Sequence, residues 1–223
     1  MTERSISRRY DFSIVEAQWL SDLTGVASDL DAIVRICTRV EEDGKKFDEA
    51  LTSTDVSWFE DRKFLADLAS AAIVRYGRTF GTGIRAGIPS EWITSLSPEL
   101  QSSHQYLKNL RDKSIAHSVS PLEDNQVWVW LVETHNESCI ATHISVDSGS
   151  YLPGTTEARA LLKLCQSLRP MVEAAIEGES QRLLALAQGM SQSEIVRRGS
   201  DELPIPSTKS VAKSRPRFKR YQP

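Results

Sequence analysis

The chain lacks the short motifs that identify many enzyme classes. It has no glycine-rich phosphate-binding loop, no HExxH or GxSxG motif, and no pair of CxxC sequences. Its three cysteines, Cys37, Cys139 and Cys165, are far apart, and two of them lie among apolar residues of expected helices. We therefore expect buried free thiols, no bound metal and no cofactor.

Long apolar segments are also missing. No run approaches the roughly 18 apolar residues that a membrane-spanning helix needs. The first ten residues are polar and basic, and the apolar region of a secretory signal does not follow them. We expect a cytoplasmic protein without a membrane partner, and its 223 residues suffice for one core.

Acidic residues are absent from the end of the sequence. Residues 1–202 hold all 30 acidic residues and 21 of the 27 lysines and arginines, a net charge of −9. The last 21 residues carry six basic residues and four prolines. This composition predicts a disordered basic tail over residues 200–223. Such a tail can bind nucleic acid or an acidic partner, or can simply increase solubility.

Apolar residues recur at helical spacing through most of residues 1–199, which we expect to form one domain. Three- and four-residue steps predict a helix over residues 11–43, with Gly44 as a candidate stop. A second helix should begin after candidate caps at residues 53–55 and end at Gly81.

Two more long helices are expected. One should follow Ser97, because serine can cap a helix and the next residues, proline and glutamate, suit its first turn. It should run to about His117 and stop before Pro121. The last should open at Thr155 or Thr156 and continue through Pro170, with helical segments reaching residues 190–196.

Between these two helices the period of the apolar residues changes to two. The pattern predicts a β-hairpin over about residues 125–147. Because an isolated hairpin is marginally stable in water, we expect it to pack on the helices. Trp128 and Trp130 share one face, where they can cover the core or a dimer partner, or stack on bases. The fold class is therefore mainly α, an antiparallel helical bundle with an inserted hairpin.

The main functional candidates are Arg111 and His117. The planar fork of an arginine fits phosphate, and a histidine can exchange a proton near neutral pH. On a helical wheel both lie at the edges of the apolar stripe that Leu100, Leu107 and Leu110 form, rather than on the solvent face. Together they could cleave a phosphodiester without a metal. Alternatively, His117 caps the helix end and Arg111 pairs with an internal acid.

These residues also carry a family resemblance. The sequence LRDKSIAHS, residues 110–118, resembles the signature of the HEPN superfamily, Arg-x(4–6)-His with a polar residue after the arginine. Here the gap is five residues and the polar residue is Asp112. The long helices, and the hairpin before the last of them, are similar to the abortive-infection-associated branch. The resemblance covers residues 12–190.

The resemblance implies a homodimer across the motif helices and, in many members, a metal-independent endoribonuclease of defence, toxin–antitoxin or stress systems. His117 would transfer protons, Arg111 would bind the phosphate, and Asp112 would orient them. RNA supplies its 2′-OH as nucleophile, so a cyclic phosphate end is expected. Other members are non-catalytic modules for dimerisation and for binding a protein or nucleic acid, which is the alternative here. A neutralising or regulatory protein is a further expected partner.

Additional basic residues are candidates for binding RNA. Lys113 lies within the motif, and Arg75, Arg78 and Arg85 surround the end of the second helix. The alternative for these arginines is solvated surface or pairing with acidic residues of the body. His104 lies near the apolar stripe, and we expect it to be packed rather than catalytic.

Overall fold

The computed structural model describes residues 10, 12, 14–50, 58–81, 85–115, 123–133 and 139–198. Several sequence predictions lie outside these residues: the caps at 53–55, His117, Pro121, the hairpin turn and the tail 200–223.

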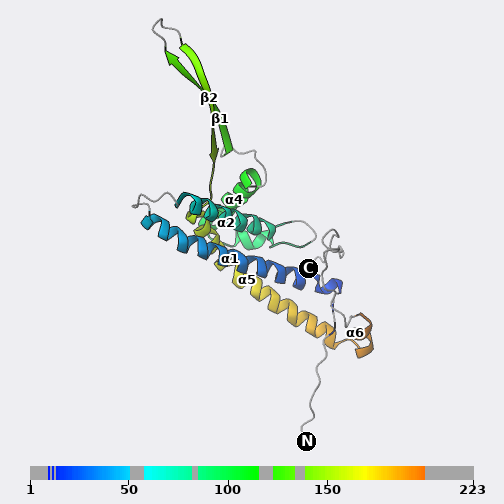
Figure 1. Ribbon diagram of the computed structural model, residues 1–223. Coiled ribbons are helices and arrows are strands. Elements are labelled where there is room, and N and C mark those ends of the chain that lie inside the picture. Colours follow the sequence, from blue (N-terminus) through cyan, green and yellow to red (C-terminus); the bar gives the residue numbers. More distant parts are fainter. Residues whose placement is uncertain are drawn as a thin grey trace.

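The described residues form a mainly helical structure with one two-stranded antiparallel hairpin, which confirms the predicted fold class (Figure 1). The elements are η1 Val15–Ala17, α1 Gln18–Ala50, α2 Trp58–Arg78, α3 Ser90–Thr94, α4 Pro98–Leu110, η2 Arg111–Ile115, β1 Glu123–Glu133, β2 Cys139–Ser150, α5 Thr155–Gln188 and α6 Gln192–Arg198. No helix among them is long and apolar enough to cross a membrane.

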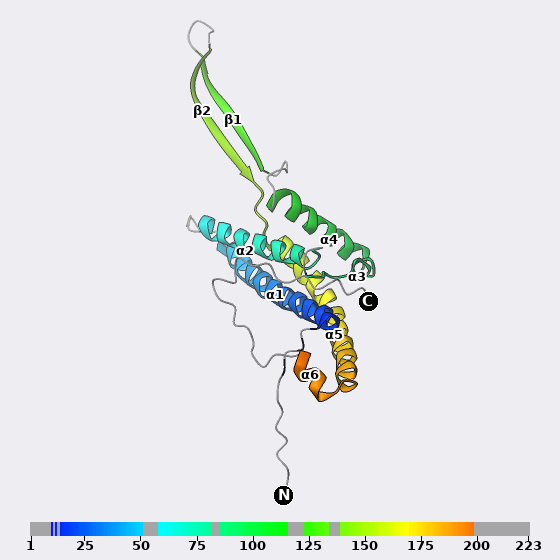
Figure 2. The same cartoon turned by 90° about the vertical axis from the view of Figure 1, so that its right-hand side faces the viewer.

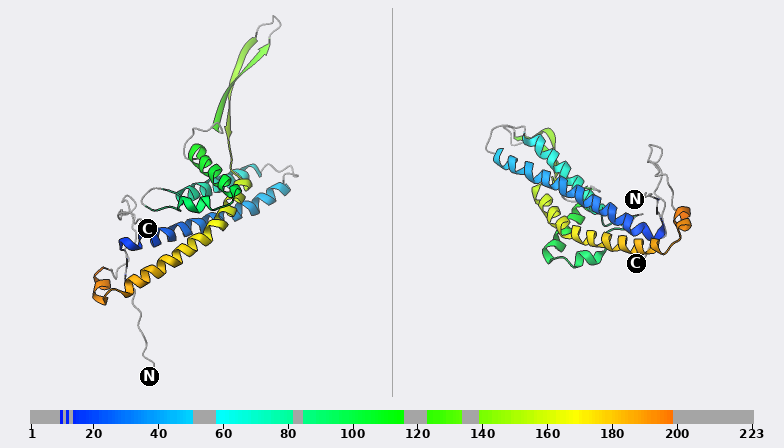
Figure 3. Two further views of the ribbon diagram at one scale, coloured as in Figure 1. Left: turned by 180° about the vertical axis from the view of Figure 1, so that it is seen from behind. Right: turned by 90° about the horizontal axis from the view of Figure 1, so that it is seen from below.

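Helices α1 and α5 are the two longest elements and pack against each other in antiparallel fashion (Figure 3). Their apolar stripes follow the three- and four-residue spacing seen in the sequence, so the buried side chains face one another. Fully buried residues of this contact are Leu23, Leu30, Ile33, Cys37 and Val40 from α1, and Leu161, Leu164, Cys165, Leu168 and Val172 from α5. Cys37 and Cys165 are free thiols, as expected, and burial raises the pKa of Cys37 to about 12.

Helices α2 and α4 complete the core. Helix α2 packs against α1 and α5, and Ala69, Ile73 and Tyr76 are among its buried side chains. The start of α4 also agrees with the sequence, because the Ser97 side chain accepts a hydrogen bond from the Leu100 N–H at 3.4 Å. Leu107 is fully buried and fixes the end of this helix against the bundle.

The predicted helix stop at Gly44 is wrong. Helix α1 continues through Gly44 to Ala50, and Gly44 is buried. A Cβ at this position would lie 2.2 Å from the Cγ2 of Thr155, at the start of α5. Glycine is therefore needed where the two helices approach each other, and it does not end α1.

The expectation that the hairpin packs on the helices is also wrong. Figures 1 and 2 show β1 and β2 extending away from the helical body. The eight large apolar side chains of its central part are between 49% and 68% exposed. The turn between the strands, residues 134–138, lies outside the described part of the chain.

A buried carboxylate joins the base of the hairpin to the bundle. Glu157, in the first turn of α5, accepts hydrogen bonds from the hydroxyls of Tyr151 at 2.6 Å and Tyr106 at 3.0 Å. Its second oxygen accepts the Gly154 N–H at 2.8 Å. Burial raises the pKa of Glu157, but these donated hydrogen bonds more than offset it, so the net shift is downward.

We expect Gly44→Ala to lower the free energy of unfolding by about 1–3 kcal/mol, because the added methyl collides with Thr155. Adding Thr155→Ser to the Gly44→Ala variant removes the opposing Cγ2 and should restore much of the lost stability. Gly178→Ala is the matched control, since no atom lies within 4 Å of the place that its Cβ would take and alanine favours the helix. Urea denaturation measures all four proteins. Equal effects of the Gly44 and Gly178 substitutions would contradict the close approach.

Glu157→Gln should reduce stability near neutral pH, with a smaller difference from wild type in acid. A carboxyl whose pKa is lowered by folding stabilises the protein above its unfolded pKa of about 4.3, and this contribution disappears as pH falls. Urea denaturation over a pH series measures the difference. Glu99→Gln, at an exposed ion pair with Lys163, is the control and should change little. A difference that does not shrink in acid would contradict the assignment.

Candidate active site at the end of α4

The motif arginine lies at the point where α4 changes its helical geometry. The α-helix ends at Leu110, and Arg111–Ile115 form a π-helical turn. The Arg111 N–H donates to the carbonyl oxygens of Leu107 and Lys108, so the start of this turn remains bonded to α4. Buried Leu107 and Leu110 hold the same turn against the core. The backbone of Arg111 is therefore fixed by the bundle.

The Arg111 side chain lies directly over Gly77 of α2. A Cβ on Gly77 would be 3.0 Å from Nε, 3.1 Å from Cδ and 3.3 Å from Cγ of Arg111. The Nε atom is buried and has no hydrogen-bond partner among the described residues. Glycine at position 77 therefore leaves the space in which the arginine stem crosses α2.

The end of the guanidinium contacts the next residue of the motif. Nη1 of Arg111 donates to Oδ1 of Asp112 at 2.6 Å. The two side chains are 37% and 40% exposed, so solvent or a ligand can reach both. The acid that pairs with Arg111 is thus part of the motif, and not the internal acid that the sequence left open. A charge-assisted contact of this kind restricts the orientation of the guanidinium.

The other predicted members of the site are distributed around this turn. Lys113 is exposed in the π-helical turn, and Arg78 is exposed next to Gly77. His117 lies outside the described residues, so its position relative to Arg111 stays a prediction. In the described part of the chain, no three His, Cys, Asp or Glu side chains are grouped as metal ligands.

Arg75 has a different environment, because it is paired within the body. Its Nη1 lies 3.0 Å from Oδ1 of the buried Asp29 in α1, and Nη2 of Arg85 lies 2.6 Å from the other oxygen. This arrangement is the pairing with acidic residues that the sequence left as an alternative. Asp22, also in α1, accepts a hydrogen bond from the Ala86 N–H at 2.9 Å. The two acids hold α2 and the following loop on α1.

His104 is a packed residue, as the sequence indicated. Its Nδ1 is 2.9 Å from the hydroxyl of Tyr76, and its ring contacts Phe80 edge-on with centroids 4.6 Å apart. Burial lowers the pKa of His104, and the charge of Lys108 lowers it further. A neutral ring is therefore favoured at this position.

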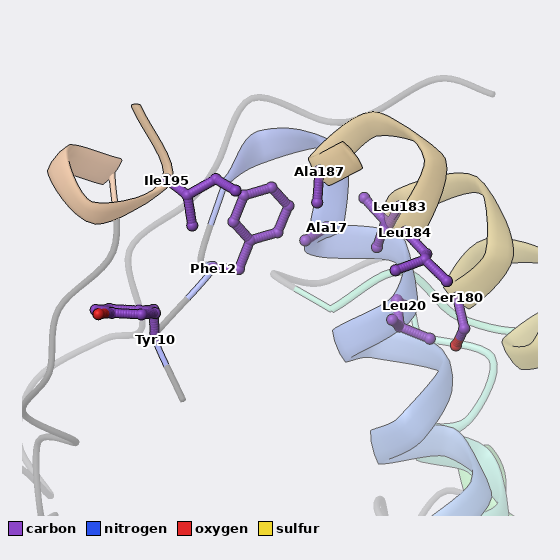
Figure 4. Close-up of a pocket in the computed structure, with 9 residues that line it drawn as sticks. All are labelled: Tyr10, Phe12, Ala17, Leu20, Ser180, Leu183, Leu184, Ala187 and Ile195. Atoms are coloured by element: carbon purple, nitrogen blue, oxygen red, sulfur yellow. The ribbon is translucent and has the colours of Figure 1, made fainter. Parts of the chain in front are cut away.

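A separate apolar pocket lies at the other end of the two long helices (Figure 4). Its volume is about 440 Å³, and Phe12, Leu20, Leu183 and Ile195 are among the residues that line it. The described residues of its lining are mostly apolar, and the hydroxyls of Tyr10 and Ser180 are their only polar side-chain groups.

No family model, curated protein or solved structure matches the chain.

The residue of the site that the sequence did not reveal is Gly77. Its only signal is a glycine within the helical pattern of α2, which by itself does not reveal what crosses it.

The contact between Gly77 and Arg111 can be tested by a double-mutant cycle. In an Arg111→Ala background, Gly77→Ala should stabilise the protein by about 0.5–1 kcal/mol, because alanine favours the helix and nothing crowds it. With Arg111 present, the gain should be smaller or reversed, since the methyl meets the arginine stem. Gly178→Ala should have the same effect in both backgrounds. Urea denaturation gives the free energy of unfolding of each variant. An interaction energy of zero between positions 77 and 111 would contradict the contact.

Proposed function

We propose that this chain is a metal-independent endoribonuclease of the HEPN type, acting as a homodimer in defence, toxin–antitoxin or stress responses. The observation that carries the proposal is the arrangement of Arg111. Its backbone is fixed by α4, its stem lies on Gly77, and its partly exposed guanidinium is oriented by Asp112. Arg111 is six positions before His117, a spacing that agrees with the HEPN signature Arg-x(4–6)-His.

The proposed reaction uses the nucleophile that RNA itself contains. His117 of one protomer removes the proton of the 2′-OH, and the oxygen attacks the adjacent phosphorus. The 5′-oxygen leaves as an alcohol after it receives a proton from a second histidine, contributed by the other protomer. Arg111 stabilises the negative charge that develops on the phosphoryl oxygens. The products are a 2′,3′-cyclic phosphate and a 5′-hydroxyl.

The remaining basic residues have separate parts in this proposal. Lys113 is exposed within the motif, and Arg78 is exposed next to Gly77. The positive charges of both side chains would hold neighbouring phosphates of the substrate. Arg75 is mostly engaged with Asp29, so its contribution to RNA binding is expected to be smaller. Substitution of Arg75 would also loosen the attachment of α2 to α1.

A second candidate is a non-catalytic module that dimerises and binds a partner. The exposed apolar hairpin favours this function, because large exposed apolar surfaces commonly mark interaction sites. A nuclease does not require such a surface. The two functions make opposite predictions for purified protein and RNA.

Purified protein should cleave a labelled structured RNA in the presence of EDTA and leave cyclic phosphate ends. His117→Ala and Arg111→Ala should each reduce cleavage by about 10²–10⁴-fold, because proton transfer and charge stabilisation contribute on this scale. His143→Ala, in the exposed hairpin, is the matched control and should retain activity. Gel electrophoresis of the products measures the rates, and circular dichroism checks that each variant folds.

Activity that survives in a folded His117→Ala variant would overturn the assigned mechanism. Activity that EDTA removes and added metal restores would overturn metal independence. If the dimeric wild type leaves several RNAs intact, the non-catalytic module replaces the nuclease as the proposed function.

A further inference from the structure

The hairpin has two open edges and two exposed apolar faces. Strands β1 and β2 pair only with each other among the described residues, so each has one unpaired edge. Val127, Val129 and Leu131 point to one face of β1, and Trp128, Trp130 and Val132 point to the other. Two strands alone are marginally stable in water, whereas a third strand makes such a sheet substantially more stable.

The charge of the hairpin limits what can add to it. Residues 123–150 contain no lysine or arginine, and they contain five acids: Glu123, Asp124, Glu133, Glu137 and Asp147. A net charge of −5 opposes the phosphates of a nucleic acid, so base stacking on the tryptophans is disfavoured. The surface instead suits a basic polypeptide that can form a strand.

The outer edge of β1 is the more regular of the two. The register passes from Trp130 opposite His143 to Leu131 opposite Ala141, which leaves Thr142 as an extra residue in β2. A bulge of this kind bends a strand and disturbs its edge. In β1 the eleven residues of Glu123–Glu133 continue without an insertion.

We propose that the outer edge of β1 binds the basic C-terminal segment of a second copy of this chain as an added strand. That segment follows the last acidic residue, Glu202, and carries the basic residues Lys209, Lys213, Arg215, Arg217, Lys219 and Arg220. Residues 207–215 contain no proline, which would interrupt strand pairing. Their nine residues are comparable in length to β1, and their charge complements the acids at its two ends.

The geometry favours the segment of a second copy over that of the same chain. The hairpin leads directly into the start of α5, whereas α6, which precedes the C-terminal segment in the sequence, lies at the opposite end of α5 (Figure 2). The 34 residues of α5 span about 51 Å. Residues 199–206, which link α6 to this segment, reach at most about 29 Å even when fully extended, so a strand that begins at Ser207 falls short of its own hairpin. A second copy in the opposite orientation brings its basic segment to this hairpin.

Isotope-resolved cross-linking of the full chain tests this inference, which does not rest on the proposed nuclease activity. Equal amounts of ¹⁴N- and ¹⁵N-labelled protein are mixed and treated with a carbodiimide, which joins carboxylates to lysines in contact. We expect Glu123, Asp124 or Glu133 to be joined to Lys209 or Lys213, with hybrid isotope pairs as abundant as same-isotope pairs. The Glu99–Lys163 pair, 3.1 Å apart within one chain, is the internal control and must give same-isotope products.

A charge-reversed variant makes the test specific. Lys213→Glu combined with Arg215→Glu should reduce the hybrid products through Lys209 several-fold. The control combines Lys45→Glu with Arg62→Glu, which lie at exposed helical positions and change the net charge by the same amount. This control should leave the amount of hybrid products unchanged. Products between hairpin and C-terminal segment of one isotope only would overturn the second copy as occupant. Failure to form any such product, while the Glu99–Lys163 product forms, would overturn the proposal altogether.

Discussion

The packing of α1 against α5 is the contact on which the other parts of the structure depend. It buries the two longest apolar stripes, and each of the remaining features is attached to one of these helices. Asp22 and Asp29 of α1 hold the loop after α2 through the Ala86 N–H and Arg85, and Asp29 also holds α2 itself through Arg75. Glu157 of α5 holds the hairpin base through two tyrosines. Because α2 is fixed in this way, Gly77 can provide a defined surface for Arg111.

The sequence predicted the helices well, because their burial is repeated every three or four residues and many residues carry the same signal. It failed at Gly44, where a single missing side chain serves a contact with Thr155, more than a hundred residues away in the sequence. It also failed for the hairpin. Alternating apolar residues predict strands, but they do not say whether the helices or another molecule cover those strands.

The candidate site was predictable in part. The helical pattern and the motif placed Arg111 in the last part of the helix that starts after Ser97, but the α-helix ends at Leu110, before the predicted end near His117. The π-helical turn, the crossing over Gly77 and the pairing of Arg75 with Asp29 did not follow from the sequence, because each depends on the relative placement of two helices. His104 illustrates the opposite case. Its place beside the apolar stripe was enough to indicate a packed ring, and Tyr76 and Phe80 provide that packing.

The charges of the hairpin also determine which associations it resists. An exposed ribbon with apolar faces is the kind of structure that tends to polymerise with identical copies through its edges. Here acids occupy both ends of β1 and one end of β2, while the central residues are uncharged. Two identical hairpins pairing along β1 would bring these acids close together, and like charges in adjacent strands are destabilising. The same acids that admit a basic strand therefore act as gatekeepers against fibre formation, so the surface gains selectivity from its charge.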